Sequence, residues 1–463
     1  MINKIIYFPI EVKKRELDSR CYQALKLINK GFVVSICSKS AIVQYRKSMK
    51  RGIIYFKSSG PRYYDLMKKL KKIGHKNIMM DEEGLILLDE NLYSLRFFKK
   101  NFQYLDMIFT WGKKDFHAIR KLTKHSKIFD TGSSRIDLLT QKTNKIYFDQ
   151  AKKIRKKYGK FILINTLCTY VNHFNYKSSD DYLKIAADTK NRYKFNERQL
   201  DLSHKQVKVQ SVIFKDLKKF IEIFSKNFSD HKLLIRPHPS ENHNTWKEIT
   251  KKYKNVVYIN DHRSACSWML ASQFSISANC TTAIESFFLK KFNINYRPIK
   301  RPEVEYELPK ICGFNIRNIE DLTKFVKKNY HKSNMKINYF SKKNQKTLND
   351  KISNSNGSCS VAKMGQLLSS NFEFKNENFS MKDKIINLGK FEKFKNFLRI
   401  IYLNLKLKIF KNKKSLFSIQ KFPGLSEKEI FDRISLFKKC LGIKTKFSVV
   451  EEEPGMVIIK KTH

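Results

Sequence analysis

The sequence predicts an α/β protein whose two main domains each hold a doubly wound parallel sheet. Short apolar runs recur along the 463 residues, and amphipathic helical patterns separate them. Runs that are apolar throughout are typical of strands buried on both faces, and their alternation with helices indicates βαβ units. Because 41% of the residues are hydrophobic and only 15 Gly and 9 Pro occur, the chain can bury real cores and is not of a disordered class.

The first domain, predicted over 1–158, begins with an apolar run that ends at Pro9. A helical pattern follows over 18–27 and stops before Gly31, which is typical of a helix C-terminus. The other elements expected here are strands over 32–37, 52–56, 76–80, 106–111 and 127–130, and a helix over 63–73.

The second domain is predicted over 159–370 and begins with a buried strand over 161–165. Residues 172–209 are polar, so we expect a long insertion or loop there. The other elements expected are strands over 232–236, 255–259, 274–278 and 294–296, and helices over 212–228, 282–290 and 360–368.

The third region, 371–463, is predicted to be a basic, α-rich extension. Within it, residues 382–414 contain eleven Lys or Arg against two acidic residues. Apolar residues spaced three or four apart form a stripe on one face of a helix there: Phe391, Phe394, Leu398, Ile401 and Leu405. Such a stripe is typical of contact with an anionic membrane surface, but it suits packing on the protein body equally well.

The net charge of the chain limits the kinds of partner that it favours but does not indicate a function. The 94 Lys and Arg exceed the 42 Asp and Glu by 94 − 42 = 52, which favours anionic partners. Drift toward a Lys-, Asn- and Ile-rich composition produces the same excess. A non-enzymatic nucleic-acid-binding protein is the alternative that the charge suggests. No RNP, KH or zinc-finger pattern supports it, so we expect no nucleic-acid partner.

We expect the protein to be cytoplasmic. Its eight cysteines are scattered without a CxxC pair, as in reduced cytosolic proteins, and no metal site is indicated. The apolar run Ile5–Ile10 is too short for a signal peptide, and no apolar stretch of about 18 residues is present. The basic segment 382–414 adds the alternative of peripheral contact with the inner face of the cytoplasmic membrane.

An acidic motif follows the strand over 76–80: Asp81, Glu82, Glu83 and Gly84. Side chains at the carboxyl end of a strand lie at the mouth of the crevice in an open α/β sheet. Adjacent carboxylates repel one another, which predicts a raised pKa for one of them and suits it to proton transfer. Gly84 is expected to allow a tight turn. An ordinary acidic loop is the alternative.

A second motif, Arg236-Pro237-His238-Pro239, lies at the end of the strand over 232–236. The two prolines restrict the loop and hold the imidazole in place. A histidine in such a position hydrogen-bonds a phosphate or donates a proton near neutral pH, and Arg236 can pair with phosphate.

A third motif joins the strand over 274–278 to a helix and contains Ser277, Asn279, Thr281, Thr282 and Glu285. A helix N-terminus presents N–H groups to an anion, and hydroxyl groups add donors. Glu285 lies one turn into the helix, where it is placed to accept hydrogen bonds from ribose hydroxyls. Simple N-capping by Thr281 or Thr282 is the alternative.

Together and in this order, the three motifs resemble those of bacterial CMP-sialic acid-dependent sialyltransferases. They also resemble the related CMP-Kdo-type enzymes and the surface carbohydrate biosynthesis proteins of capsule and lipopolysaccharide clusters. The segments that match the surface carbohydrate family are 15–18, 81–85, 111–112, 131–137 and 279–285. Two Rossmann-like domains facing a central cleft fit the GT-B arrangement of nucleotide-sugar enzymes.

The resemblance implies a metal-independent glycosyltransferase that moves an acidic 2-keto sugar, such as sialic acid or Kdo, from a CMP-sugar to a bacterial surface glycan or lipid-linked glycan. Glu83 would be the general base with Glu82 beside it, and His238 would contact the CMP phosphate. No cofactor is implied. The implied nucleotide-sugar contacts are Arg236, Pro239, Ser277, Asn279, Thr281, Thr282 and Glu285, and the implied acceptor-side residues are Arg15, Asp18 and Gly84.

The chain departs from the family at Gly132-Ser133-Ser134-Arg135, where a Gly-Asn-Pro-Arg turn is expected, so the ordering proline is absent. Two alternative enzymes stay open: a CDP-glycerol glycerophosphotransferase-like protein and a UDP-GlcNAc 2-epimerase-like GT-B protein. Both resemble the chain at the Arg-Pro-His-Pro loop and the Ser/Thr helix start. The acidic motif at 81–84 favours the CMP-sugar interpretation.

Overall fold

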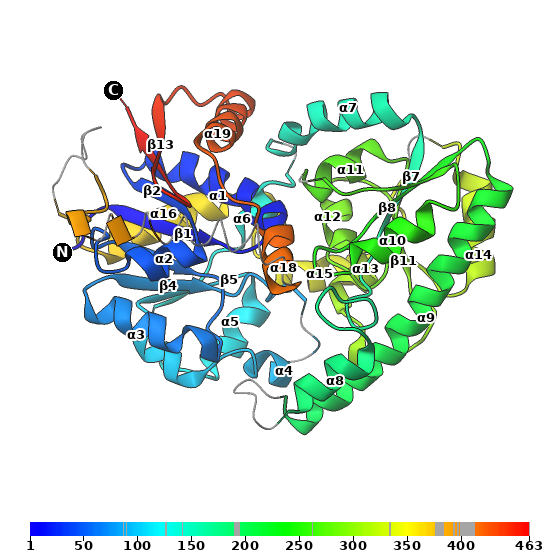
Figure 1. The fold of residues 1–463 in the computed structure, drawn as a ribbon, viewed down its shortest axis with the longest axis horizontal. Helices are drawn as coiled ribbons and strands as arrows, with labels where there is room; N and C mark the ends of the chain where they lie inside the picture. The colour runs from blue at the N-terminus through cyan, green and yellow to red at the C-terminus, as the bar shows by residue number, and fades with distance from the viewer. Residues whose placement is uncertain are drawn as a thin grey trace. The chain divides into compact units, whose positions relative to one another are not determined.

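The computed structural model describes most of the chain. The residues outside its description are 87, 89, 126, 141, 189–194, 262, 333–334, 376–383, 392–393, 396–397, 399–412 and 463. The described residues form two compact units, each with its own sheet (Figure 1). Unit 1 contains Met1–Gly84, Ser94–Leu138 and Asn349–His463, and unit 2 contains Leu85–Tyr93 and Leu139–Leu348.

Unit 1 is built on an eight-stranded sheet with the order β13-β14-β2-β1-β3-β4-β5-β6. The strands from β2 to β6 in this order are parallel, and the chain leaves β1 first toward β2 and then toward β3 on its other side. The winding direction therefore switches between β1 and β3. The strands are β1 (Ile5–Ile10), β2 (Val33–Ser38), β3 (Ile53–Phe56), β4 (Lys76–Met80), β5 (Met107–Thr110), β6 (Ile128–Asp130), β13 (Phe447–Glu453) and β14 (Met456–Lys461).

Helices cover both faces of this sheet, because right-handed crossovers that run in opposite directions place their helices on opposite faces. Helix α1 packs against β2, α16 and α19 on one face, and α2 and α3 lie over the other (Figure 1). The helices are α1 (Lys13–Ile28), α2 (Lys39–Tyr45), α3 (Tyr64–Lys72), α5 (Lys113–Arg120), α6 (Ser134–Asp137), α16 (Ser360–Asn371), α18 (Lys413–Lys421) and α19 (Glu427–Leu441), with 3-10 turns η1 (Pro61–Tyr63) and η2 (Lys99–Tyr104).

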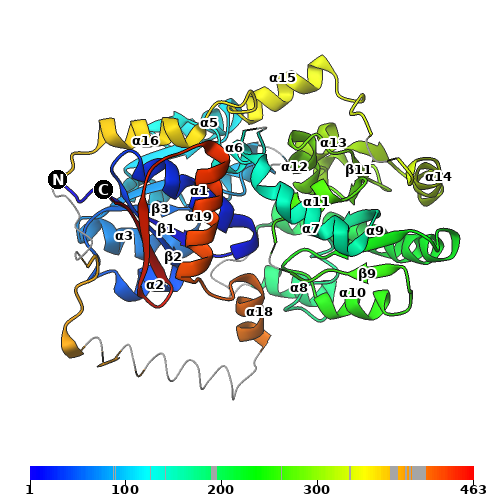
Figure 2. The same cartoon turned by 90° about the horizontal axis from the view of Figure 1, so that it is seen from above.

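The end of the chain completes unit 1, which corrects the expectation of a separate extension over 371–463. Strand β14 pairs antiparallel with β2 beside the end of the chain (Figure 2). Val457 lies opposite Ile36, and both side chains are buried. All residues of β2 are buried. The hairpin of β13 and β14 covers the edge of β2, which would otherwise be open to solvent. Helix α19 begins after Ser426, whose side chain accepts the N–H of Glu429.

The predicted basic stripe lies partly outside the described residues. Ile401 and Leu405 are not described. At the described positions, Phe391, Phe394 and Leu398 are 76%, 59% and 49% exposed. Their apolar surface is therefore not buried within the part of the chain that the structure describes.

Unit 2 is built on a six-stranded, wholly parallel sheet with the order β12-β11-β10-β7-β8-β9. The winding direction switches between β7 and β10. The strands are β7 (Phe161–Asn165), β8 (Lys232–Arg236), β9 (Val256–Tyr258), β10 (Ser275–Ser277), β11 (Asn293–Tyr296) and β12 (Phe314–Ile316). The sequence prediction ended this series at 294–296 and missed β12, because three residues at a sheet edge carry little apolar signal.

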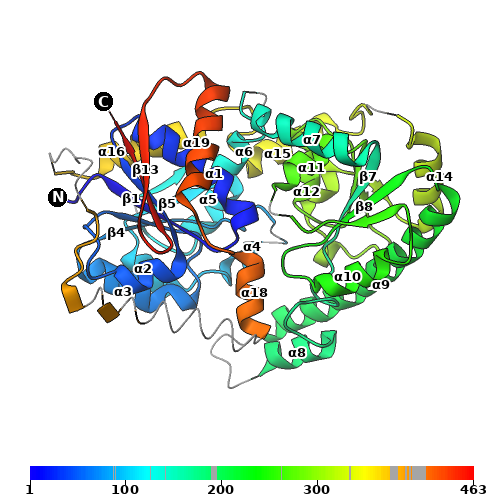
Figure 3. The ribbon, with the colours of Figure 1, turned by 45° about the horizontal axis from the view of Figure 1, so that its top comes forward.

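Helices α11 and α12 cover one face of this sheet, and α9 and α10 cover the other (Figure 3). Helix α7 packs against α11, so unit 2 begins well before the predicted boundary at residue 159. The helices are α4 (Glu90–Ser94), α7 (Phe148–Tyr158), α8 (Ser179–Ala187), α9 (Glu197–Asn227), α10 (His243–Thr250), α11 (Ala265–Ala271), α12 (Thr282–Phe288), α13 (Glu307–Cys312), α14 (Ile319–Asn329) and α15 (Lys342–Lys351), with 3-10 turns η3 (Asn144–Tyr147) and η4 (Pro302–Val304).

The prediction of a loop over 172–209 is wrong, because α8 and the first turns of α9 lie there. Helix α9 starts with a capping box in which Asn196 accepts the N–H of Gln199 and the Gln199 side chain returns to the backbone of Asn196. The segment is polar because its helices bury only a narrow face, so its composition resembles that of a loop.

The predicted α/β class, with two Rossmann-like units, is confirmed. Among the residues that the structure describes, no helix has the length and apolar character needed to cross a membrane.

Candidate functional site

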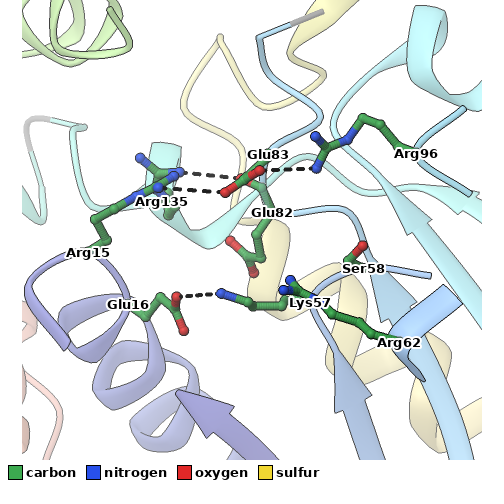
Figure 4. A pocket seen from close by; sticks show the side chains of 9 residues that line it. All are labelled: Arg15, Glu16, Lys57, Ser58, Arg62, Glu82, Glu83, Arg96 and Arg135. Carbon is green, nitrogen blue, oxygen red and sulfur yellow. Dashed lines mark hydrogen bonds and ion pairs between the residues drawn. The ribbon is translucent and has the colours of Figure 1, made fainter. Parts of the chain in front are cut away.

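A pocket lies at the carboxyl ends of β1, β3 and β4 in unit 1 (Figure 4). It adjoins the switch between β1 and β3, the position where open α/β sheets bind ligands. Its empty volume is about 420 Å³, part of it open to solvent. The lining side chains are charged or polar: Arg15, Glu16, Lys57, Ser58, Arg62, Glu82, Glu83, Arg96 and Arg135.

Glu82 is held in a buried ion pair. Its Oε1 accepts hydrogen bonds from Arg20 at 2.9 Å and from the Tyr55 hydroxyl at 2.8 Å. Arg20 is fully buried, and its guanidinium lies 4.4 Å from the centre of the Tyr55 ring. Burial opposes the charged form of Glu82, but the Arg20 guanidinium outweighs it and lowers the pKa. Glu82 therefore ties β4 to α1 and β3.

Glu83 is the exposed member of the acidic motif, with 51% of its side chain accessible. Arg96 lies 3.2 Å from its Oε2, and Arg15 lies 3.8 Å from its Oε1. Burial raises the pKa of Glu83, but Arg96 and Arg15 outweigh burial and lower the pKa to about 2. The prediction of a raised pKa in this motif is wrong, because the field there comes from arginines rather than from the neighbouring carboxylates.

Asp81 holds Arg96 in position beside Glu83. Its two carboxylate oxygens accept from Nε and Nη2 of Arg96 at 2.7 and 2.9 Å. Its carbonyl accepts from Nε1 of Trp111 at 2.7 Å and from the N–H of Gly84 at 2.9 Å. A tight turn from Asp81 to Gly84 is thus present, and it directs Glu83 toward Arg96.

The other wall of the pocket carries Glu16 and Lys57. The Glu16 carboxylate accepts the N–H groups of Glu11 and Val12 at 3.0 and 3.2 Å, at the start of α1. The Lys57 ammonium lies 3.1 Å from Glu16 and 2.9 Å from Glu11. Arg62, which is 51% exposed, lies 3.9 Å from Glu11.

Four lining residues were not predicted from the sequence to belong to a site: Glu16, Lys57, Arg62 and Arg96. The first three follow β1 and β3 closely, so the rule applied to β4 would have found them at those strand ends. Arg96 follows a short helix, and no local pattern marks it.

Arg15 lines the pocket, whereas Asp18 does not. Asp18 pairs with Arg433 of α19. The Asp18 side chain therefore faces the C-terminal helix. Asp18 thus links α1 to α19, and its expected acceptor-side role stays a prediction.

The segment 131–137 mainly contacts the part of the chain that re-enters unit 1 at residue 349. Gly132 has a φ of 73°, and a Cβ there would lie 2.2 Å from the Asn354 side chain. Asn354 accepts the N–H of Ser133 at 3.1 Å and donates to its carbonyl at 2.9 Å. Arg135 is the member of this segment that lines the pocket.

Asp137 anchors the same segment to α16. Its carboxylate accepts from Asn354 Nδ2 at 2.6 Å, from the N–H and hydroxyl of Ser360 at 3.0 and 2.9 Å, and from the N–H of Val361 at 3.2 Å. Burial raises the pKa of Asp137 despite these donors. The carboxylate therefore acts as the N-terminal cap of α16, supplied from a distant part of the chain.

In unit 2, the residues expected to bind the nucleotide-sugar lie at the carboxyl ends of β8 and β10. Strands β7 and β10 flank the switch of this sheet, and β8 is the next strand beyond β7. Arg236 is the last residue of β8 and His238 follows it, whereas Thr282 and Glu285 lie in α12, which follows β10. The structure thus brings these four to the same edge of one sheet.

His238 is oriented by its own loop. Its Nδ1 accepts the N–H of Ser240 at 3.2 Å, so the neutral ring carries its proton on Nε2. Its backbone N–H donates to Glu241 at 3.3 Å, and its carbonyl accepts from His243 at 3.1 Å. The loop therefore presents the imidazole as an N–H donor at Nε2. Pro239 follows in the same loop and is buried.

Glu241, which no sequence motif marks, holds this loop in place. It is fully buried and accepts hydrogen bonds from Thr166 at 2.7 Å, Trp246 at 2.6 Å and the N–H of Cys168 at 3.1 Å. Burial raises its pKa. The carboxylate joins the loops after β7 and β8 to α10, and no local motif predicts such a long-range role.

Ser277 and Asn279 shape the loop after β10. The Ser277 hydroxyl accepts from Asn293 at 3.0 Å. Asn279 adopts a φ of 49°, donates to the Val304 carbonyl at 2.9 Å and accepts the N–H of Tyr306 at 2.8 Å. These side-chain groups are engaged with the protein itself, which favours a positioning role for both residues.

The two threonines at α12 do not cap it, so the N-capping alternative is wrong. Thr281 makes no side-chain cap, and the buried hydroxyl of Thr282 has no hydrogen-bond partner among the described residues. Leaving such a group unsatisfied costs about 1–3 kcal/mol, which a ligand acceptor would recover. Burial lowers the pKa of Arg236, whereas the Asp261 and Glu285 carboxylates act in the opposite direction.

No group of three or more His, Cys, Asp or Glu side chains in the described parts of the chain is arranged to hold a metal ion.

The fold and these strand-end residues define a two-unit α/β protein of the Rossmann type. No known family and no curated protein sequence matches the chain. Among solved structures, it is similar to the UDP-GlcNAc 2-epimerase from Methanocaldococcus jannaschii, with 14% identity, 79% of this chain and 98% of that chain covered, and a TM-score of 0.45.

Two further structures are similar at the same level. The wall teichoic acid polymerase TagF, soaked with CDPG, has 13% identity over 80% of this chain and 88% of its own, with a TM-score of 0.49. The UDP-GlcNAc 2-epimerase from Neisseria meningitidis, bound to UDP-GlcNAc, has 14% identity over 79% of this chain and 99% of its own, with a TM-score of 0.45.

Proposed function

We propose that the chain is a GT-B glycosyltransferase that moves an acidic 2-keto sugar from a CMP-sugar to a bacterial surface glycan. Unit 2 binds the donor, and unit 1 binds the acceptor. The observation that carries the proposal is a group of hydrogen-bond donors suited to a phosphate group, which lie beside the switch of the six-stranded sheet: Arg236, His238 and Thr282. Nucleotides bind at this position in doubly wound sheets. The preference for CMP and a 2-keto sugar follows from the motif resemblance.

On the donor side, the Nε2–H of His238 and the guanidinium of Arg236 stabilise the phosphate as its bond to the sugar breaks. The Thr281 and Thr282 hydroxyls add donors, and Glu285 accepts from the ribose. Pro239, Ser277 and Asn279 hold the two loops in shape. This step needs no metal ion, because protein donors neutralise the leaving phosphate.

On the acceptor side, Glu83 accepts a hydrogen bond from the attacking hydroxyl and orients it. Its pKa of about 2 makes it a weak base while Arg96 and Arg15 pair with it. Removal of the hydroxyl proton by Glu83 therefore requires that the acceptor loosen these ion pairs. Glu82 contributes by holding the turn through Arg20.

A nucleotide panel tests the donor assignment. We expect CMP to raise the melting temperature of the full chain more than CDP, UDP or GDP, and mass spectrometry to detect transfer from CMP-Neu5Ac or CMP-Kdo. Stabilisation by UDP or CDP-glycerol without any by CMP would instead support an epimerase-like or glycerophosphotransferase-like enzyme. Tight, salt-sensitive binding of nucleic acid that survives loss of His238 would support the non-enzymatic alternative.

Two variants separate the roles of the units. His238→Ala should weaken CMP binding and abolish transfer, whereas Glu83→Gln should abolish transfer and leave CMP binding unchanged. Loss of such a group typically lowers turnover about 10²–10⁴-fold. Circular dichroism checks the fold of each variant, and turnover near that of the unmodified chain in either would refute the mechanism.

We also propose that the enzyme works in the cytoplasm at the inner face of the membrane, where segment 382–414 meets anionic lipid. The exposed aromatic side chains of Phe391 and Phe394 support this placement.

A further inference from the structure

The pocket of unit 1 carries an excess of positive charge. Its lining holds five cations against three carboxylates, a net charge of 5 − 3 = +2. Like charges held together at a partly enclosed site repel one another, and this repulsion is relieved when an anion binds. The pocket therefore favours a negatively charged ligand, although it also contains the acidic motif.

Two of these cations retain hydrogen-bonding capacity toward a ligand. Arg15 is 3.8 Å from Glu83, and Arg62 is 3.9 Å from Glu11, so neither ion pair is short enough to be a hydrogen bond. Lys57 differs, because it contacts its carboxylate partners at about 3 Å. Arg15 enters the pocket from α1, and Arg62 enters it from η1.

One lysine outside the lining, Lys39, experiences the same positive field. Burial lowers the pKa of Lys39, and repulsion from Arg62 lowers it further, although Glu11 acts in the opposite direction. The Lys39 ammonium lies 4.4 Å from the centre of the Tyr63 ring, directly after Arg62 in the chain. The excess charge thus extends beyond the pocket wall on the side of Arg62.

The geometry points to a phosphate monoester group as the ligand of this pocket, held by Arg15 and Arg62. A carboxylate has one charge and is satisfied by a single guanidinium, whereas a phosphate monoester has nearly two charges and three acceptor oxygens at neutral pH. Because Arg15 also borders Glu83, a phosphate bound there lies beside the residue that orients the attacking hydroxyl. The assignment of this phosphate to the sugar acceptor rests on the proposed function.

Phosphate binding by the full chain tests the inference without any transfer reaction. Inorganic phosphate and acetate are titrated at pH 7.5 and constant ionic strength, with melting temperature and calorimetry as readouts. We expect phosphate to stabilise the protein and acetate to have little effect. The Arg15→Ala/Arg62→Ala double variant should bind phosphate at least tenfold more weakly. Arg120→Ala, at an exposed arginine of unit 1 outside the pocket, should bind it unchanged.

His238→Ala distinguishes this pocket from the donor site of unit 2, where we also propose phosphate contacts. Phosphate binding that disappears in His238→Ala but persists in the double variant would place the ion in unit 2 and overturn the inference. Equal stabilisation by acetate and phosphate would overturn it as well. If the double variant is unfolded before phosphate is added, Arg62→Gln alone replaces it, and unchanged affinity there would be equally decisive.

Different results would refute the proposed function and the phosphate inference. If CMP-sugar transfer is absent but the double variant loses phosphate binding, the proposed function is wrong and the phosphate site remains. If transfer occurs and phosphate binding does not depend on Arg15 and Arg62, the phosphate inference is wrong and the enzyme remains.

Discussion

At the scale of single residues, arginines determine what the acidic motif can do. Arg20 converts Glu82 into half of a buried ion pair, and Arg96 and Arg15 keep Glu83 ionised. Two neighbouring carboxylates in the sequence therefore have different roles: one holds the turn, and the other faces the pocket. The difference arises from side chains that are distant in sequence.

Arg20→Met should destabilise unit 1 strongly, because it leaves Glu82 buried without its cation. Removing one partner of a buried ion pair costs about 3–5 kcal/mol in the free energy of unfolding. Urea denaturation followed by circular dichroism measures this loss. The Arg20→Met/Glu82→Gln double variant should recover part of it, and a loss below about 1 kcal/mol in the single variant would contradict the role of the pair.

Glu11→Gln should lower stability at neutral pH and have little effect at pH 2. Burial raises the pKa of Glu11, but Lys57 and Arg62 outweigh burial and lower it to about 2, against an ordinary value of 4.5. A lowered pKa stabilises the fold above the ordinary value, and this stabilisation disappears as the pH falls toward 2. After allowance for solvent screening we expect about 1 kcal/mol at pH 7. Urea titrations at both pH values test this, and an equal loss at both would contradict it.

At the scale of elements, the returning chain closes unit 1 through polar contacts. Helix α16 receives its N-terminal cap from Asp137, more than two hundred residues earlier in the chain. Gly132 and Gly112 leave room for this segment, since a Cβ on Gly112 would lie 2.4 Å from the backbone of Lys351. The motifs around residues 111 and 131 therefore have a mainly structural role. Among residues 131–137, Arg135 alone lines the pocket.

Asp137→Ala should loosen α16 while the sheet of unit 1 persists. The variant removes the acceptor of the N–H groups of Ser360 and Val361, and loss of such a cap costs about 1–2 kcal/mol. Hydrogen exchange measured by mass spectrometry should show faster exchange in 360–371. Asp432→Ala, at an exposed aspartate of α19, is the control, and unchanged exchange in 360–371 of the Asp137 variant would refute the cap.

At the scale of the whole molecule, the chain leaves unit 1 after residue 138, builds unit 2 and returns at residue 349. Its last strands then extend the first sheet at β2. Removing 371–463 would therefore uncover β2, and any loss of membrane binding would be confused with loss of the fold. A test of membrane contact must change the surface and keep β13 and β14.

Phe391→Ser/Phe394→Ser should weaken sedimentation with anionic liposomes several-fold and leave the melting temperature unchanged. Both side chains are more than half exposed, so little packing is lost. Liposomes of phosphatidylcholine alone and the variant Phe431→Ser, at an exposed phenylalanine of α19, are the controls. Equal sedimentation of the double variant and the unmodified chain would exclude this part of the segment from membrane contact.

The parallel sheets and the strand ends that carry the candidate site residues can be predicted from the sequence. The apolar residues at 78–80, 161–164 and 233–235 lie in β4, β7 and β8, because the part of a strand that is buried on both faces is mostly apolar. The polar residues that follow such strands lie at the carboxyl edge of the sheet whatever their partners are. This is why the sequence alone places Glu83 and His238 at strand ends.

Three features could not be predicted from the sequence: the charge state of the acidic motif, the place of the last strands and the polar network around Glu241. Each depends on groups far apart in sequence: Arg20 with Glu82, β14 with β2, Thr166 with Glu241. Electrostatic and hydrogen-bonding energies depend on distances of a few ångströms in space. The sequence therefore places a carboxylate at a strand end, and the fold decides whether it binds, holds a turn or moves a proton.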